Sequence, residues 1–122
     1  MSFFNNAPVV FLENEDFSSA GELKVPAHEP IVAMIMSSGC PHCHDAAPMF
    51  EKFARANEGH IVCGAILTDA SPSERQLAAR LPAIVPDIVG VPSFVLFRNG
   101  RYIKTHAGAR TADALKKFAE TS

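Results

Sequence analysis

Two cysteines three positions apart, Cys40 and Cys43, are the residues of this chain best placed to do chemistry. Thiols at this spacing can close into a disulfide and reopen. In an intracellular chain a C-x-x-C pair indicates redox chemistry or a metal rather than a structural staple. A third cysteine, Cys63, lies inside the apolar run 61–67. We interpret Cys63 as a small buried hydrophobic residue, because free cysteines commonly pack in this way.

The elements around the pair would hold the two sulfurs differently. The run Ile31–Met36 has no polar residue, which favours a strand buried on both faces. After a short turn, apolar residues recur at helical spacing, so we expect a helix over about 41–57, kinked at Pro48. Cys40 would then lie exposed where the strand gives way to the helix, and Cys43 would point into the protein.

The start of that helix would also activate the outer sulfur. The free N–H groups of a helix N-terminus carry about half a positive charge, which stabilises an anion there, and the thiolate is the form that attacks disulfides. Pro41 presets the helical backbone, and His42 adds a charge when protonated or a hydrogen bond when neutral. We therefore expect the thiolate of Cys40 to be more stable than that of a free cysteine, which makes the disulfide a better oxidant.

Three other interpretations of the motif stay open at this point. Residues 40–44 also spell C-x-x-C-H, a haem-attachment pattern, although the chain has the pattern of an α/β domain rather than of a small helical haem protein. A zinc site from Cys40, Cys43 and either His42 or His44 lacks a second ligand pair. A domain could also keep a non-catalytic C-x-x-C on its surface. We favour dithiol–disulfide exchange without metal or cofactor. The remaining histidines stand alone and are interpreted as surface residues: His28, His60 and His106.

Strands and helices alternate along the rest of the chain. Strands are expected at 9–12, 31–36, 61–67, 93–97 and 102–106, and helices at 13–24, 41–57, from the Ser71 cap to Pro82, and after the Thr111 cap. Asn99-Gly100 is typical of a hairpin turn. Helices between buried strands imply parallel pairing with helices on both faces, and the hairpin adds an antiparallel edge.

Length and charge narrow the function classes. The 122 residues fit one domain, 1–122, with 48% hydrophobic and 20% charged residues. The 11 basic and 13 acidic residues give a net charge of −2, so no basic excess exists to bind nucleic acid. The apolar runs are far shorter than the ~20 residues that a membrane span needs. Only uncharged residues precede the first apolar segment, so we expect no export signal and a cytoplasmic location.

These residues resemble the thioredoxin family from about residue 9 to residue 120. Four features carry the resemblance together: the Cys40-Pro41-His42-Cys43 motif between a buried strand and a helix, Pro48 five residues beyond the second cysteine, Gly90-Val91-Pro92-Ser93 in the place of the family's cis-proline loop, and the 97–101 hairpin followed by Gly108-Ala109. The resemblance implies a thioredoxin-like α/β fold, with a central mixed β-sheet flanked by helices on both faces.

The resemblance also implies a protein thiol–disulfide oxidoreductase. Cys40 would attack a target disulfide and Cys43 would resolve the mixed disulfide. Pro92 would be cis and face the pair, and the backbone of Val91 would bind an extended substrate segment, with Gly39 and Gly108 beside it. The implied partners are proteins carrying a disulfide or a dithiol and a redox partner for electron transport, and we expect a monomer.

Departures from the family leave a second function open. The chain has no tryptophan, and Gly39 precedes the first cysteine. The Pro41-His42 dipeptide is similar to that of the bacterial periplasmic oxidase DsbA, which argues for an oxidising couple. Met34 and Ala65 stand where thioredoxins have a buried acid and its partner lysine, and the 71–89 segment is longer than usual. The alternative is a catalytically weak binding or assembly module, and the direction of electron flow stays open.

Overall fold

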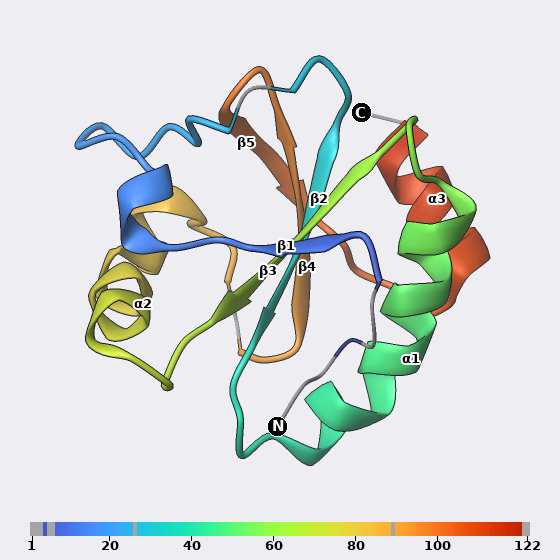
Figure 1. Cartoon of the computed structure of the whole chain (residues 1–122), viewed down its shortest axis with the longest axis horizontal. Coiled ribbons are helices and arrows are strands. Elements are labelled where there is room, and N and C mark those ends of the chain that lie inside the picture. The colour runs from blue at the N-terminus through green and yellow to red at the C-terminus, as the bar shows by residue number, and fades with distance from the viewer. Residues whose placement is uncertain (1–3, 5–6, 26, 89, 121–122) are drawn as a thin grey trace.

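The structure, a computed structural model, describes residues 4, 7–25, 27–88 and 90–120. A five-stranded sheet runs through the middle of these residues in the order β1-β3-β2-β4-β5 (Figure 1). Its strands are β1 (Val9–Phe11), β2 (Ile31–Met36), β3 (Val62–Leu67), β4 (Ser93–Arg98) and β5 (Arg101–Thr105). Strands β1, β3 and β2 are parallel, whereas β4 is antiparallel to both of its neighbours.

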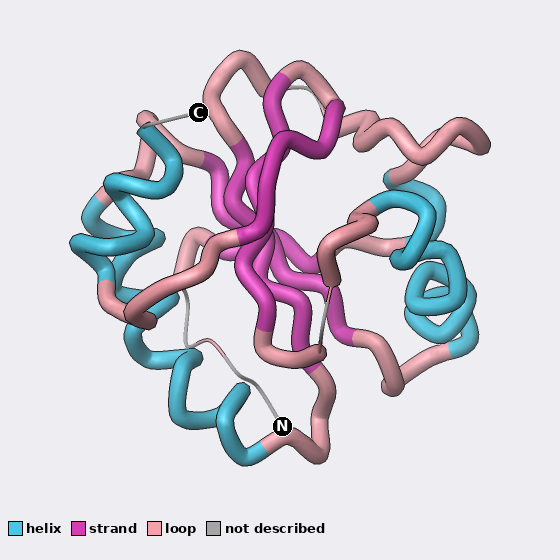
Figure 2. Tube along the Cα trace, turned by 180° about the vertical axis from the view of Figure 1, so that it is seen from behind, coloured by secondary structure: helices cyan, strands magenta, loops and turns pink. Residues whose placement is uncertain are grey.

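Helices cover both faces of this mixed sheet. Helices α1 (Pro41–Ala56) and α3 (Ala112–Glu120) lie together on one face, and α2 (Pro72–Ile84) lies on the other with the short 3-10 helix η1 (Asn14–Asp16) (Figures 1 and 2). The α/β class with a central mixed sheet between helices, predicted from the sequence, is confirmed.

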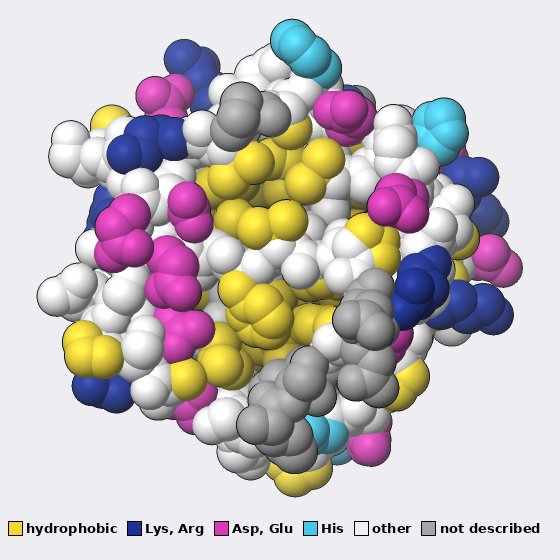
Figure 3. All heavy atoms as spheres, viewed as in Figure 1, with side chains coloured by type: hydrophobic (Ala, Val, Ile, Leu, Met, Phe, Trp, Pro, Cys, Tyr) yellow, Lys and Arg dark blue, Asp and Glu magenta, His cyan; other side chains and the backbone are white. Residues whose placement is uncertain are grey.

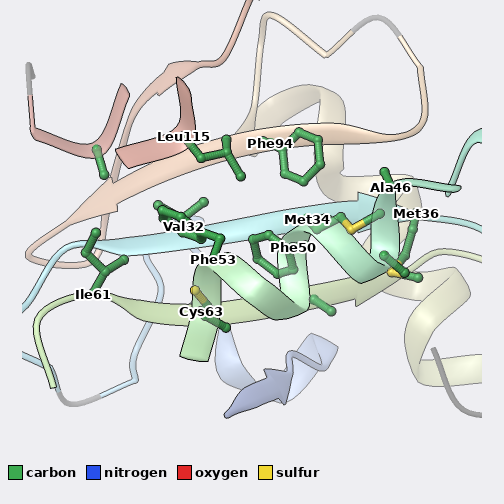
Figure 4. Packing of buried hydrophobic residues seen from close by; sticks show 14 of the residues in the cluster. Val32, Met34, Met36, Ala46, Phe50, Phe53, Ile61, Cys63, Phe94 and Leu115 are labelled. Carbon is green, nitrogen blue, oxygen red and sulfur yellow. The ribbon is translucent and has the colours of Figure 1, made fainter. Parts of the chain in front are cut away.

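Side chains of strand β2 pack in both layers of the core because they alternate between the two faces of the sheet. Val32, Met34 and Met36 pack with α1 and α3, as Figure 4 shows around Phe50 and Leu115. The intervening residues of β2 pack with α2 in a second cluster that includes Leu77, Val95 and Phe97. All six residues of β2 are buried, which accounts for the unbroken apolar run in the sequence.

One edge of the sheet carries exposed apolar side chains. Val10 and Phe11 of β1 are 52% and 39% exposed. Figure 3, which faces this edge, shows apolar side chains gathered across the middle of the view. The ring of Phe11 contacts that of Phe4, and Phe4 in turn contacts Phe50 of α1.

Local signals fix the ends of several elements as expected. The Ser71 hydroxyl accepts a hydrogen bond from Glu74 N–H at 3.2 Å at the start of α2, and the Thr111 hydroxyl accepts one from Ala114 N–H at 3.1 Å at the start of α3. Asn99 and Gly100 have positive φ values, 52° and 81°, as the hairpin turn between β4 and β5 requires.

Two expectations for helices are wrong. No helix spans 13–24: after η1 the chain turns tightly at Gly21, whose φ of 89° favours glycine, and Gly21 N–H donates to Ser18 O. Phe17 and Leu23 then pair as an antiparallel bridge, and Leu23 N–H bonds to Gly100 O at 2.8 Å, so this segment folds back on itself as a tight loop tied to the hairpin instead of forming a helix. Nor does Pro82 end α2, which continues to Ile84 because Ile84 is buried in the second core cluster.

Within the described residues, no helix has both the length and the apolar character that crossing a bilayer requires.

Candidate active site

The two cysteines of the C-x-x-C motif lie where strand β2 gives way to helix α1. Cys40 is the N-cap of α1, with an extended backbone, and its Sγ accepts a hydrogen bond from Cys43 N–H at 3.1 Å. The side chain of Cys40 is partly exposed, whereas Cys43 is 0% exposed and packs in the core on the α1 side. The outer sulfur is therefore open to a partner, and the inner one is shielded behind it.

Burial makes Cys43 a weak acid. Its pKa rises from 9.0 to about 11, first because of burial and second because of its hydrogen bond with Cys40. A hydrogen bond from the backbone of Ser37 and the positive charge of Arg110 act in the opposite direction. Cys43 is accordingly held as a neutral thiol at neutral pH.

The loop before β4 meets the outer sulfur. The Val91–Pro92 peptide bond is cis, and Val91 O lies 3.8 Å from Cys40 Sγ. Pro92 is buried and Val91 is half-buried, and the Ser93 hydroxyl donates back to Gly90 O. Val91, one of the two predicted substrate-contacting residues of this loop, therefore lies next to Cys40 in space, although 51 positions separate the two residues in the sequence.

The turn that presents Cys40 is fixed from two sides. The Asp69 carboxylate accepts hydrogen bonds from Ser38 N–H at 3.0 Å and from the Ser38 hydroxyl at 2.9 Å. These bonds, the backbone one first, lower the pKa of Asp69. The ring Nε2 of His44 lies 2.9 Å from Ser38 O. Sequence reasoning missed Asp69, which follows β3; its position after the strand neighbouring β2 was the available signal.

The other predicted residues lie around this centre. Pro41 is the first residue of α1, and Pro41, His42 and Gly39 are all exposed. A Cβ added at Gly39 would meet no heavy atom within 4 Å, so space does not require glycine there. Gly108 follows β5, and a Cβ there would touch only the His106 ring at 3.4 Å.

A small cavity of about 260 Å³ connects the cis-proline loop to the loop after β5. Pro92, His106, Gly108 and Arg110 are among its lining residues. Arg110 was not identified from the sequence, and its charge nonetheless acts on Cys43. The nearest signal was its position two residues after Gly108, which the family resemblance had already placed near the site.

The described residues do not form a candidate metal site. Within the part of the chain that the structure describes, His, Cys, Asp and Glu form no group of three able to hold a metal ion. The remaining cysteine, Cys63, is 1% exposed on β3, and burial raises its pKa to about 12. Cys63 is therefore the small buried residue that the sequence predicted.

Comparison with known proteins identifies the family. The family model described as thioredoxin matches residues 8–121. This chain belongs to the thioredoxin family. The resemblance drawn from its motifs is thereby confirmed over nearly the whole chain.

Individual relatives of this thioredoxin-family chain differ greatly in length. The thioredoxin-like protein 453L of Invertebrate iridescent virus 6 is 30% identical, with 80% of each chain covered. DnaJ homolog subfamily C member 10 of Homo sapiens is 28% identical over 91% of this chain, and that match spans 12% of the human protein. The chain is thus similar to one segment of this longer relative.

Solved structures of thioredoxin-like domains superpose on the same fold. The crystal structure of the J-Trx1 fragment of ERdj5 has a TM-score of 0.71 at 26% identity, covering 93% of this chain and 51% of that one. The crystal structure of ERdj5 form II gives 0.67 at 25% identity, covering 92% and 14%. With Cys40 and Cys43 in place, these relationships support an oxidoreductase-type role of the thioredoxin kind.

Proposed function

We propose that this protein is a thiol–disulfide oxidoreductase that exchanges protein disulfides through Cys40 and Cys43. One observation carries the proposal: the Cys40 sulfur is partly exposed at the N-terminus of α1, 3.8 Å from Val91 O, with the Cys43 N–H donating to it from behind. An exposed sulfur at a helix N-terminus is placed to react as a thiolate.

The reaction proceeds in two exchange steps. The Cys40 thiolate attacks one sulfur of a substrate disulfide, forming a mixed disulfide and releasing the other substrate sulfur as a thiolate, which takes up a proton. Cys43 then loses its proton and attacks the Cys40 sulfur, which forms the Cys40–Cys43 disulfide and expels the second substrate thiolate. The substrate gains two electrons and two protons, and the dithiol is oxidised. The reverse sequence oxidises a substrate dithiol.

Substrate would bind beside the cis-proline loop. The backbone of Val91 faces Cys40, so an extended segment pairing with that backbone would bring its sulfur to Cys40. Gly39, which precedes Cys40, and Gly108, which lines a cavity with Pro92, are both exposed and would contact the same substrate segment. The cytoplasmic location, the monomeric state and the redox partner stay predictions, which cell fractionation, sedimentation and capture of mixed disulfides would test.

Reduction of insulin by dithiothreitol tests the proposal. The wild type should accelerate the reaction, Cys40→Ser should be inactive, and Cys63→Ala, which removes a thiol remote from the site, should keep the activity. Equal activity of the wild type and Cys40→Ser would contradict the assignment. Titration of the dithiol against glutathione would then give the direction of electron flow; a strongly reducing potential would contradict the oxidising role inferred from His42.

A second candidate function, a binding or assembly module with slow turnover, rests on the surroundings of Cys43. Met34 and Ala65 are cross-strand neighbours in β2 and β3 and are both fully buried, so no acid or lysine side chain stands at these positions to move the Cys43 proton. The wild-type and Cys40→Ser forms of such a module would bind protein partners equally well. Neither form would accelerate insulin reduction.

A further inference from the structure

In the second exchange step Cys43 has to form a thiolate while it is buried. The positions of Met34 and Ala65 in the neighbouring strands offer no charged side chain to help. A buried thiolate depends on hydrogen-bond donors, because burial removes the water that would otherwise solvate it. Burial raises the pKa of Cys43, and a hydrogen bond from the backbone of Ser37 acts to lower it. The Ser37 N–H is therefore a donor on which this step depends.

Thr68 holds the peptide group to which that N–H belongs. The oxygen of this group, Met36 O, accepts hydrogen bonds from Thr68 N–H at 3.0 Å and from the Thr68 hydroxyl at 3.1 Å. The peptide between Met36 and Ser37 is trans, so its C=O and its N–H point in opposite directions within one plane. Two donors on the oxygen thus fix the direction of the Ser37 N–H, which donates to Cys43.

The hydroxyl bond from Thr68 is additional to the pairing of the sheet. Thr68 N–H extends the ladder between β2 and β3 and already supplies Met36 O with a donor. The carbonyl therefore does not need the hydroxyl in order to be satisfied. A second donor on a carbonyl polarises the peptide group and strengthens the hydrogen bond that its N–H donates. The Thr68 hydroxyl accordingly makes Ser37 a better donor to a thiolate.

Bonds on the next residue hold the same stretch of chain from its other side. Ser38 N–H and the Ser38 hydroxyl both donate to the carboxylate of Asp69, which directly follows Thr68 in the sequence. One short loop after β3 therefore fixes the chain immediately before and immediately after the Ser37 N–H. The donor to Cys43 is held from outside α1, and it does not depend on the helix for its orientation.

We propose that Thr68 is a positioning residue for the second exchange step: its hydroxyl orients the Ser37 N–H that stabilises the Cys43 thiolate. In this step Cys43 gives its proton to a solvent base and its sulfur bonds to Cys40 Sγ. The bond between Cys40 Sγ and the substrate sulfur breaks, and the substrate leaves as a thiolate that takes up a proton from solvent. The inference rests on the proposed function. It concerns the second step alone, because Cys40 Sγ receives its N–H donor from within α1.

Reaction of the reduced full chain with one equivalent of dithiobis(2-nitrobenzoate) separates the two steps. Attack by Cys40 releases one coloured thionitrobenzoate, and attack by Cys43 on the mixed disulfide releases a second, so stopped-flow absorbance records two phases. Thr68→Val replaces the hydroxyl by a methyl group of similar size. It should slow the second phase about two- to threefold and leave the first unchanged. Thr68→Ser keeps the hydroxyl and should restore the wild-type rate.

Controls separate the hydroxyl from folding and from the proposed function. Ser18→Ala removes a hydroxyl that bonds to Glu22 N–H instead, and should change neither phase. An unchanged first phase also shows that each variant is folded. Equal second phases in wild type and Thr68→Val would overturn this inference alone, as would equal slowing of both phases or a Thr68→Ser variant as slow as Thr68→Val. A wild type that releases only one thionitrobenzoate would overturn the proposed function, and this inference with it.

Discussion

Cys40 and Cys43 lie three residues apart, yet the fold places their sulfurs in unlike surroundings. Cys40 caps α1 and receives an N–H donor, whereas Cys43 is enclosed by the core beneath it. A substrate disulfide can approach the first sulfur and not the second. The order of attack follows from this difference, since the buried Cys43 thiol can react only with the Cys40 sulfur, after that sulfur has bonded to the substrate.

The pH dependence of substrate release follows from the environment of Cys43. Burial, the first cause of its raised pKa of about 11, persists when Cys40 is bound to substrate. Release needs the Cys43 thiolate, so its rate should rise about tenfold per pH unit from pH 7 to pH 10. Stopped-flow measurement of a preformed mixed disulfide checks this, and Cys43→Ala should retain the adduct. A release rate that levels off near pH 8 would contradict the assignment.

Arg110 should tune the same step. Its positive charge lowers the pKa of Cys43, so Arg110→Gln should raise that pKa and slow release a few-fold at neutral pH, whereas Arg110→Lys should restore most of the rate. Because Arg110 is exposed, added salt should shrink the difference between wild type and Arg110→Gln. Arg75→Gln serves as the charge-matched control. An unshifted pH profile in Arg110→Gln would remove Arg110 from the mechanism.

At the scale of elements, parallel strands bring the parts of the site together. Met36 and Leu67 are partners at the ends of β2 and β3, and Thr68 N–H donates to Met36 O at 3.0 Å. The loops that follow these strands therefore leave the sheet side by side. Asp69 in one loop can bond to Ser38 in the other, and this contact holds the turn that leads into Cys40.

The Asp69–Ser38 contact should make stability depend on acid pH. The pKa of Asp69 is lowered from the ordinary 3.8, so its stabilising effect is fully present above that value and is lost as pH falls through the lower folded-state pKa. Asp69→Asn should therefore be less stable than wild type at pH 6, and the gap should narrow below pH 3.8. Urea denaturation at pH 6 and below pH 3.8 measures the two stability differences, with Glu58→Gln as the exposed control. A gap that does not change with pH would contradict this role.

The sequence predicted the elements whose signals are local. The apolar run Ile31–Met36, the caps at Ser71 and Thr111, and the Asn99-Gly100 turn each depend on neighbouring residues, and each is found where expected. The 13–24 segment failed because its structure depends on distant partners. Leu23 bonds to the hairpin at Gly100, where an added Cβ would lie 2.7 Å from Leu23 O.

The functional residues also differ in whether a local sequence signal could identify them. Cys40 and Cys43 could be identified because their spacing is itself the signal. Asp69 and Arg110 act across loops, the first on Ser38 and the second on Cys43, at separations that no short motif records. Their roles emerge only when the sheet has assembled and brought those loops to one end.

At the scale of the whole molecule, a buried thiol in the core makes the stability of the fold depend on alkaline pH. Cys63 lies on β3 in the core shared with α1 and α3 (Figure 4), and its pKa of about 12 lies well above the ordinary 9.0. The folded state therefore holds this proton more tightly than the unfolded state does. The resulting stabilisation is complete below pH 9.0 and is lost as pH rises toward 12, at up to about 1.4 kcal/mol per pH unit.

Replacement of this thiol tests the claim. Cys63→Ala should cost about 1 kcal/mol at pH 7, because it removes a buried sulfur from a packed core. Above pH 9 the variant should lose stability less steeply than wild type, so that the two curves converge by about pH 10. Urea denaturation under reductant from pH 7 to pH 11 measures both curves. Ionisation of Cys43 at alkaline pH lowers the free energy of unfolding of both proteins equally. Parallel curves over that range would therefore show that Cys63 is not the group responsible.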